Sequence, residues 1–183
     1  MRARRRGFTL IEMIVVIAIM LILATTITPV IVGNLDKARV DKSEATLENF
    51  TAAIDAFRTD VKHYPGMLTQ LTRPLDAGDR DSCGDTYPPG HRNAWRGPYL
   101  SREVPETGLP VGIGTAQNAL LRQSVGGQTY LRIVIPLVSL DDATALNDVV
   151  DGDASSTSGT IQWTAPDAQG LVTLYYSIPV SSC

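Results

Sequence analysis

The stretch that decides the fold is "GFTLIEMIVVIAIMLILATTITPV", which runs from Gly7 to Val30. Between Phe8 and Thr28 its only ionisable side chain is that of Glu12. A helix of this length measures about 31 Å at about 1.5 Å per residue, which matches a hydrocarbon core of about 30 Å. The stretch therefore predicts a transmembrane helix over residues 8–29.

The charges around this stretch predict its orientation. Four arginines precede Gly7, and the mixed-charge residues Asp36, Lys37 and Arg39 follow the apolar run. The positive-inside rule places the N-terminus in the cytoplasm and the remaining chain on the other side of the membrane. Without the four arginines, Lys+Arg falls from 16 to 12 against 19 Asp+Glu, so the formal net charge changes from −3 to −7. An acidic body argues against a general nucleic-acid binder, and we expect no nucleic-acid partner.

Glu12 is the residue that a plain membrane anchor leaves unexplained. An ionised carboxylate within a membrane helix costs about 2.5–3.5 kcal/mol on insertion scales. A cleaved secretory signal fits poorly as well, because its apolar core spans only about 7–15 residues and precedes a small-residue cleavage site. The segment "LATTITPV" is a poor site of that kind.

The segment "RRRGFTLIEMIVVIA" resembles the leader junction of type IV prepilins and of the pseudopilins of type II secretion. The resemblance implies that a prepilin peptidase removes residues 1–7 by cutting between Gly7 and Phe8, and that Phe8 is then N-methylated. It matches Glu12 to the family's glutamate, and Pro29 to a proline that the family often carries near the end of its membrane segment.

This resemblance suggests a role for Glu12 in assembly. Cleavage creates an α-amino group at Phe8 that is largely cationic near neutral pH. We predict that Glu12 of one subunit pairs with the Phe8 ammonium of its neighbour, because two costly buried charges become tolerable as a hydrogen-bonded pair. Such a pair also sets the axial register between subunits. The alternative is that Glu12 lies close enough to the cytoplasmic interface to stay hydrated.

Residues 30–62 are predicted to form the amphipathic half of one long helix that extends from Phe8 to Lys62. Apolar side chains recur there at helical spacing, as a core-facing stripe requires; they are Leu47, Phe50, Ile54, Phe57 and Val61. Tyr64-Pro65-Gly66 ends the helix, because the residue before proline is disfavoured in the αR conformation and glycine supports a turn.

Residues 63–183 are predicted to form a globular head. A short helix is expected at residues 67–73, β-rich runs occupy 129–138, 160–164 and 171–178, and Ser139 is placed to cap a helix that ends near Val149. Pro136 and Pro179 suggest strand ends or an edge strand. Three or four antiparallel strands packed on the amphipathic helix give an α+β fold. The resemblance to type IV pilins implies that this is the pilin fold.

The head carries a second resemblance. The segments "HYPGMLTQLTRP" and "NAWRGPYLSREVP" resemble the region after the long helix in the major pseudopilin of type II secretion. The resemblance implies that a loop is fixed onto the long helix, with Trp95 and Tyr99 as apolar anchors.

The sequence predicts no enzyme. It contains none of the motifs G-x-S-x-G, H-E-x-x-H or a glycine-rich phosphate loop around its two histidines, His63 and His91. The major pseudopilin family binds calcium in a loop near its C-terminus, and Ca²⁺ needs six to eight oxygen ligands. Asp148, Asp151 and Asp153 are candidate ligands, but we interpret their segment as a polar hairpin loop with Asp-Gly turn chemistry. We expect no other cofactor.

The two cysteines, Cys83 and Cys183, bear on which filament the chain forms. A C-terminal cysteine bonded to an earlier one is common in type IV pilins, so the resemblance implies a Cys83–Cys183 disulfide in an oxidising compartment. Major pseudopilins usually lack this bond, whereas the match at residues 95–100 favours a pseudopilin.

We therefore predict a non-enzymatic pseudopilin subunit of a helical filament that drives type II protein secretion. One alternative is a type IV pilin for adhesion, motility or DNA uptake, and another is a monomeric membrane-anchored domain that binds calcium or another ligand. The expected partners are further copies of the chain, other pilins or pseudopilins, the prepilin peptidase and an inner-membrane assembly platform. The expected location is the bacterial inner membrane, with a single pass, a periplasmic head, and a filament in the periplasm or at the cell surface.

Overall fold

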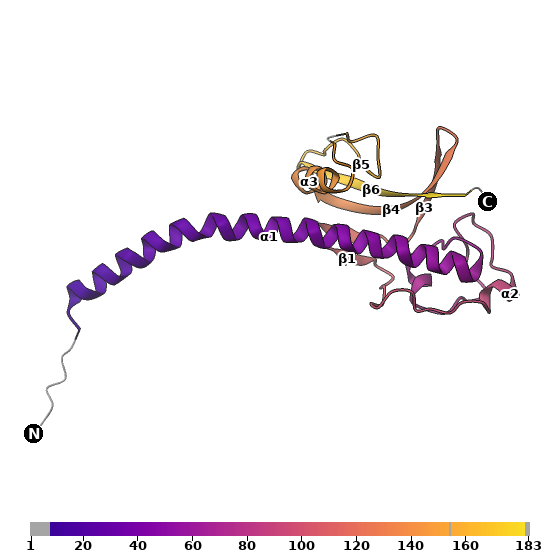
Figure 1. Cartoon of the computed structure of the whole chain (residues 1–183), viewed down its shortest axis with the longest axis horizontal. Coiled ribbons are helices and arrows are strands. Elements are labelled where there is room, and N and C mark those ends of the chain that lie inside the picture. Colours follow the sequence, from indigo (N-terminus) through magenta and orange to yellow (C-terminus); the bar gives the residue numbers. More distant parts are fainter. Residues whose placement is uncertain (1–7, 154, 182–183) are drawn as a thin grey trace, which may run out of the picture. The chain divides into compact units, whose positions relative to one another are not determined.

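The computed structural model describes residues 8–153 and 155–181, and leaves the side chains of residues 26–32 undescribed. The chain divides into two units, residues 1–38 and 39–183, and one helix, α1 (Leu10–Val61), contributes to both (Figure 1). This helix confirms the helix predicted from Phe8 to Lys62 to within two residues at its N-terminal end. The backbone at Pro29 is helical, and the side chain of Pro29 lies outside the described residues. Among the described residues, no helix meets the combined requirement of length and apolarity for a bilayer crossing.

The first unit carries an apolar surface. Every described side chain from Phe8 to Thr25 is exposed. The large apolar side chains among them include Phe8, Leu10, Ile11, Ile14, Ile17, Met20, Leu21 and Ile22. Contiguous exposed apolar surface marks a site that lipid or another protein covers.

The second unit contains the remaining elements. They are η1 (Leu68–Leu71), α2 (Pro89–Arg92), β1 (Leu109–Val111), β2 (Gly114–Ala116), β3 (Leu121–Val125), β4 (Gln128–Ser139), α3 (Leu140–Val150), β5 (Ile161–Trp163) and β6 (Leu171–Val180). Strands β3-β4-β6-β5 form one antiparallel sheet in that order, and β1 pairs with β2 in a hairpin. This arrangement confirms the predicted α+β fold.

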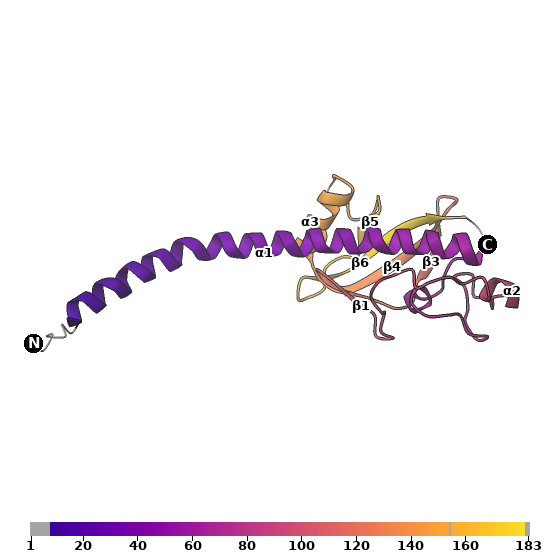
Figure 2. The same cartoon turned by 60° about the horizontal axis from the view of Figure 1, so that its bottom comes forward.

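The core lies between α1 and the four-stranded sheet. Figures 1 and 2 show β4 and β6 running alongside the C-terminal half of α1. The predicted stripe from Leu47 to Val61 is buried, and it faces buried residues of the sheet such as Leu131 and Ile133. Full burial of one such side chain contributes about 1.5–3 kcal/mol, so this interface is the main source of stability in the head. The stripe prediction is confirmed.

Strand β4 contains an irregularity at Pro136. Its pairing register with β6 shifts between Ile135 and Val138, and Leu137 adopts a φ of 58°. Pro136 lies inside β4, so the expectation of a strand end is wrong. Strand β3 pairs only with residues 128–132 of β4 and does not extend to Pro136, which agrees with the expectation of an edge position. A bulge accommodates the missing N–H group of proline at this position. Pro179 does lie at a free side of β6, because β5 pairs only with the residues from Leu174 to Tyr176.

The predicted helix after Ser139 is α3. The Ser139 hydroxyl accepts a hydrogen bond from the Asp142 backbone N–H at 3.1 Å, which confirms Ser139 as the N-cap. Helix α3 is further connected to α1, because the Arg39 guanidinium lies 3.4 Å from the Asp142 carboxylate.

A glycine allows the β1–β2 hairpin to dock on α1. A Cβ atom at Gly112 would lie only 1.9 Å from the Arg39 carbonyl oxygen. Beside this contact, the buried Ser43 hydroxyl donates to the Arg39 carbonyl at 2.8 Å and accepts the Ile113 N–H at 3.0 Å. The hairpin therefore contacts the helix backbone directly, which a larger residue at position 112 would prevent.

Candidate functional site

The predicted processing and assembly residues lie at the start of α1. Gly7 lies outside the described residues, and Phe8 is the first described residue, with an exposed side chain. Thr9 is the N-cap of α1. Its backbone N–H and its hydroxyl lie 3.4 Å from Glu12 Oε2, and the Glu12 N–H donates to the Thr9 hydroxyl at 3.3 Å. Reciprocal bonds of this kind define a capping box.

The capping box gives Glu12 a role within its own chain. It satisfies backbone N–H groups that have no partner at a helix start, and a carboxylate there also interacts favourably with the helix dipole. The pattern Thr-x-x-Glu is visible in "TLIE" and is a known sequence signal of a helix start, but our prediction of intersubunit pairing did not use it. The pairing of Glu12 with a neighbouring Phe8 stays a prediction.

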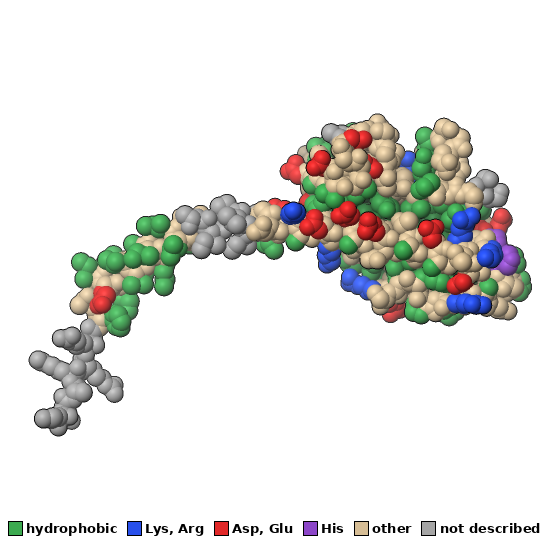
Figure 3. Space-filling model, viewed as in Figure 1, with side chains coloured by type: hydrophobic (Ala, Val, Ile, Leu, Met, Phe, Trp, Pro, Cys, Tyr) green, Lys and Arg blue, Asp and Glu red, His purple; other side chains and the backbone are tan. Residues whose placement is uncertain are grey.

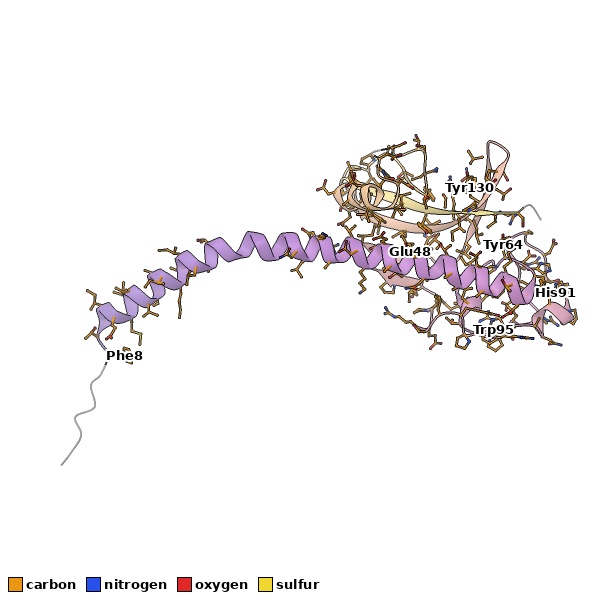
Figure 4. All side chains as sticks on the ribbon, in the orientation of Figure 1. Phe8, Glu48, Tyr64, His91, Trp95 and Tyr130 are labelled. Carbon is orange, nitrogen blue, oxygen red and sulfur yellow. The ribbon has the colours of Figure 1, made fainter. Side chains whose placement is uncertain are left out.

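Trp95 and Tyr99 lie where the second resemblance placed them. The Trp95 indole N–H donates to the Gln70 carbonyl at 2.9 Å, and the Tyr99 hydroxyl donates to the Asp60 carboxylate at 2.9 Å. The Tyr99 ring also packs edge-on against Phe57 of α1, with ring centroids 5.7 Å apart, and burial raises the pKa of Tyr99. Figure 4 shows Trp95 on the side of α1 away from the sheet. Both side chains therefore anchor the loop against the core, and Tyr99 fixes it directly onto α1, whereas Trp95 binds Gln70 of η1.

The Cys83 loop lies close to the end of the chain. Cys83 is disulfide-bonded, and Cys183 lies outside the described residues. The Arg122 guanidinium donates to the Ser82 hydroxyl at 3.1 Å and also to the Ser181 carbonyl. These bonds bring the residue before Cys83 near the residue two positions before Cys183. The geometry supports the predicted disulfide, and the identity of the bonded partner stays a prediction.

The two histidines of the chain meet at the C-terminal end of α1. His63 Nδ1 lies 2.8 Å from the buried Asp81 carboxylate, and the His63 and His91 ring centroids are 4.9 Å apart. The other oxygen of Asp81 accepts the backbone N–H groups of Cys83 and Asp85 at 2.8 and 3.0 Å. Asp81 therefore holds the turn of the Cys83 loop and connects it to the end of α1 through His63.

Of the three candidate calcium ligands, Asp148 lies in α3, whereas Asp151 and Asp153 organise the loop that follows this helix. The Asp151 carboxylate accepts the backbone N–H groups of Thr160 and Ile161 at 3.0 and 2.8 Å. The Asp153 carboxylate accepts from the Asn147 side chain and from the Ser155 N–H, and these bonds lower the pKa of Asp153. Within the described residues, no group of three or more His, Cys, Asp or Glu side chains is placed to hold a metal ion. Calcium binding by Asp148, Asp151 and Asp153 stays a prediction.

Comparisons with known proteins match two successive parts of the chain separately. Residues 2–28 match the prokaryotic N-terminal methylation motif, and residues 30–109 match type II secretion system protein G. These matches confirm the resemblance to prepilins and to the major pseudopilin. Residues 110–183, which contain the four-stranded sheet, lie outside both matched regions.

Individual relatives agree with the family match. The chain is 39% identical over 77 residues to a type II secretion system core protein G from Klebsiella michiganensis. This match covers 40% of this chain and 54% of the relative. It is 34% identical over 99 residues to the Escherichia coli K12 core protein G, covering 54% and 63% of the two chains. For the Aeromonas hydrophila protein, identity is 38% over 88 residues, covering 46% and 62%. The match thus spans 54–63% of the length of these relatives, and no solved structure matches.

Proposed function

We propose that this chain functions as a major pseudopilin, because it joins a prepilin methylation motif to a type II secretion protein G region. In this proposal the chain is a structural subunit of a helical filament, and growth of the filament drives protein export. The observation that carries the proposal is the direct succession of the two regions along the chain, at residues 2–28 and 30–109. The role requires no catalytic step.

The exposed apolar segment supports assembly through α1. Each subunit presents apolar side chains from Phe8 to Leu23 that need an apolar environment, which lipid provides before assembly and neighbouring helices provide afterwards. A filament grows without limit when each contact joins two different surfaces of identical subunits, because such contacts do not close on themselves. The capping box keeps the start of α1 ordered in the single subunit, and the Glu12 charge then pairs with the neighbouring Phe8 ammonium.

The same proposal defines partners and location. A prepilin peptidase cuts between Gly7 and Phe8 on the cytoplasmic side, and the subunit stays in the inner membrane with its head in the periplasm. An assembly platform in the inner membrane then adds the subunit to the base of the filament. The four arginines before Gly7 support this orientation, since positive residues favour the cytoplasmic side.

Intact-mass analysis of chain extracted from the native membrane tests the proposal. The expected mass lacks residues 1–7 and includes one additional methyl group. The matched control is Gly7→Leu, which should keep the leader because it changes the residue at the cut. A wild-type chain that retains residues 1–7 would support the monomeric anchored domain instead.

The disulfide-bonded Cys83 favours type IV pilin as a second candidate, because such a bond is common in that family. The two candidates differ in the phenotype of a deletion strain. A pseudopilin deletion should retain exported enzymes inside the cell and leave surface fibres unchanged. Loss of surface fibres with normal export would establish the pilin function.

A further inference from the structure

The outer face of the four-stranded sheet, directed away from α1, contains a hollow of about 570 Å³ with a mixed polar and apolar lining. Its floor comes from β4 and β6, and its walls are the β3–β4 turn and the loop before β5. Figure 3 shows a notch on this side of the head, and Figure 4 shows Tyr130, one of the lining residues, on the same side of the sheet. The lining carries hydroxyl and amide groups from Gln128, Tyr130, Thr157, Ser158, Gln162 and Ser177.

Of the described residues that line the hollow, Arg132 alone has a charged side chain. It is only 8% exposed, because neighbouring strands enclose it. Its guanidinium donates to the side-chain carbonyl oxygens of Gln123 on β3 and Gln162 on β5, at 2.5 and 2.6 Å. It also lies 5.4 Å from the centroid of the Tyr175 ring. These contacts are neutral, so they position the guanidinium without neutralising its charge.

The charge of Arg132 lacks an acidic partner in the lining. Among the described residues, none of the side chains that line the hollow is an aspartate or a glutamate. Among the described ion pairs, the cationic members are Arg39, His63 and Arg73. A buried charge without a counter-charge is unfavourable by several kcal/mol. An anion that binds in the hollow is therefore favoured, because it supplies the counter-charge that the lining lacks.

Two polar atoms at this site also lack hydrogen-bond partners. Arg132 Nε and Ser177 Oγ are both enclosed, and neither has a partner among the described residues. Ser177 is 4% exposed and lies on β6, next to Arg132 on β4, because the two residues are direct cross-strand partners. A buried polar group without a partner costs about 1–3 kcal/mol, so each such group in a native structure calls for an acceptor, a donor or a ligand.

We propose that this hollow binds an oxyanion carried by a small hydroxylated molecule, such as an acidic sugar or a sugar phosphate. An oxyanion supplies the missing negative charge and several acceptors for the Arg132 fork, which binds carboxylates and phosphates with two parallel hydrogen bonds. The hydroxyl and amide groups of the walls bind the hydroxyls of the carrier. A volume of about 570 Å³ falls within the range of about 300–1,000 Å³ that is typical of small-molecule sites.

The proposed site is independent of the filament function. Its lining residues lie between Val125 and Pro179, whereas the protein G match ends at residue 109. The inference therefore depends only on the contacts of the head, and a failure of the filament proposal would leave it unchanged.

Isothermal titration calorimetry of the full chain in detergent tests the site with two probes. Sodium glucuronate represents the carboxylate of an acidic sugar, and glucose 6-phosphate represents a sugar phosphate. Sodium chloride and glucose, at matched ionic strength and concentration, are the ligand controls. We expect saturable one-to-one binding of at least one anionic probe. The probe that binds more tightly shows whether the site prefers a carboxylate or a phosphate. Binding of neither probe overturns the proposal.

Variants test whether Arg132 carries the binding. Arg132→Gln should weaken the affinity at least tenfold, and Ser177→Ala should weaken it about threefold or more. The matched control is Arg122→Gln on the neighbouring strand, which removes an arginine outside the lining and should change affinity less than twofold. Unchanged binding by Arg132→Gln would mean that Arg132 only braces the strands. If Arg132→Gln does not fold, Ser177→Ala decides the matter, and wild-type affinity in that variant overturns the proposal.

Discussion

Arg122 of β3 donates a hydrogen bond to the hydroxyl of Ser82, forty residues earlier in the chain, at 3.1 Å. The same guanidinium donates to the Ser181 carbonyl, so one side chain links the Cys83 loop to the end of β6. These bonds show that the two cysteine-bearing segments approach one another through contacts other than the disulfide. The Cys83 loop therefore lies beside Ser181, two residues before Cys183 in the sequence, and the Cys83–Cys183 bond stays a prediction.

The first prediction concerns that bond. Cys83→Ser should lower the free energy of unfolding of the head by about 2–5 kcal/mol, because an open chain gains conformational entropy when it unfolds. Chemical denaturation in the absence of reductant measures the effect. With dithiothreitol, the wild type should approach the stability of the variant. Equal stability of wild type and Cys83→Ser without reductant would contradict a structural disulfide.

The second prediction concerns the stripe of α1. Phe57 is fully buried, and its ring contacts Tyr87 and Tyr99 edge-on. Phe57→Ala should destabilise the head by about 3–5 kcal/mol, since it removes apolar contacts and leaves a cavity. The matched control is Glu48→Ala, an exposed residue of the same helix, which should change stability by less than about 0.5 kcal/mol. Similar effects of both variants in thermal unfolding would contradict the assignment of this face to the core.

The third prediction concerns acid stability. Arg73 donates two hydrogen bonds to the Asp79 carboxylate, at 2.8 and 2.9 Å, and these bonds hold the pKa of Asp79 below its ordinary value of 3.8. At a pH between the folded-state and the unfolded-state pKa of Asp79, the folded chain binds fewer protons than the unfolded chain. The stabilisation is therefore complete above pH 3.8 and is lost as the pH falls through the folded-state pKa.

Asp79→Asn should accordingly lower stability at neutral pH by about 1 kcal/mol and should reduce the loss of stability below pH 4, as measured by thermal unfolding at a series of pH values. The control is Asp76→Asn, because that side chain is 83% exposed and its contact with Arg73 is longer, at 3.3 Å. An exposed pair of this kind contributes about 0–1 kcal/mol. A steeper acid transition in Asp79→Asn than in the wild type would contradict the assignment.

The parts of the fold that could be predicted from the sequence have long, regular patterns. The stripe from Leu47 to Val61 repeats at helical spacing over four turns, and β4 contains the consecutive β-branched residues Ile133, Val134 and Ile135. Ser139 was recognised as an N-cap because two aspartates follow it in the first turn of α3. Each pattern depends on local physical chemistry, so no knowledge of distant contacts was needed.

Three short strands were not predicted, for reasons visible in their residues. Strand β1 has only three residues with a proline at its centre, and β2 is the tripeptide Gly114–Ala116. Strand β3 lies at an edge of the sheet and is largely exposed, so it lacks an alternating apolar pattern. These strands form because the β1–β2 hairpin docks on α1 at Gly112 and because β4 offers an edge to β3. Both conditions are tertiary contacts.

The candidate sites also differ in whether they could be predicted from local sequence or depend on tertiary contacts. The Thr9–Glu12 capping box was visible in four consecutive residues, whereas the Arg132 hollow gathers residues from four strands. A buried arginine within an apolar run such as "TYLRIVIPLV" is a local signal, but its neutral partners Gln123 and Gln162 are set by the strand order. The meeting of His63 with Asp81 and His91 likewise depends on how the loop returns to the end of α1.

The measurement that most directly tests the assembly mechanism compares Glu12→Gln with Glu12→Ala. Glutamine keeps the capping bond to Thr9 and removes the charge, whereas alanine removes both. If Glu12 pairs with the Phe8 ammonium of a neighbour, processing and membrane insertion should remain normal in both variants, and both should form few filaments by electron microscopy. Normal filaments from Glu12→Gln would show that capping alone explains this glutamate, and would contradict the proposed charge pairing between subunits.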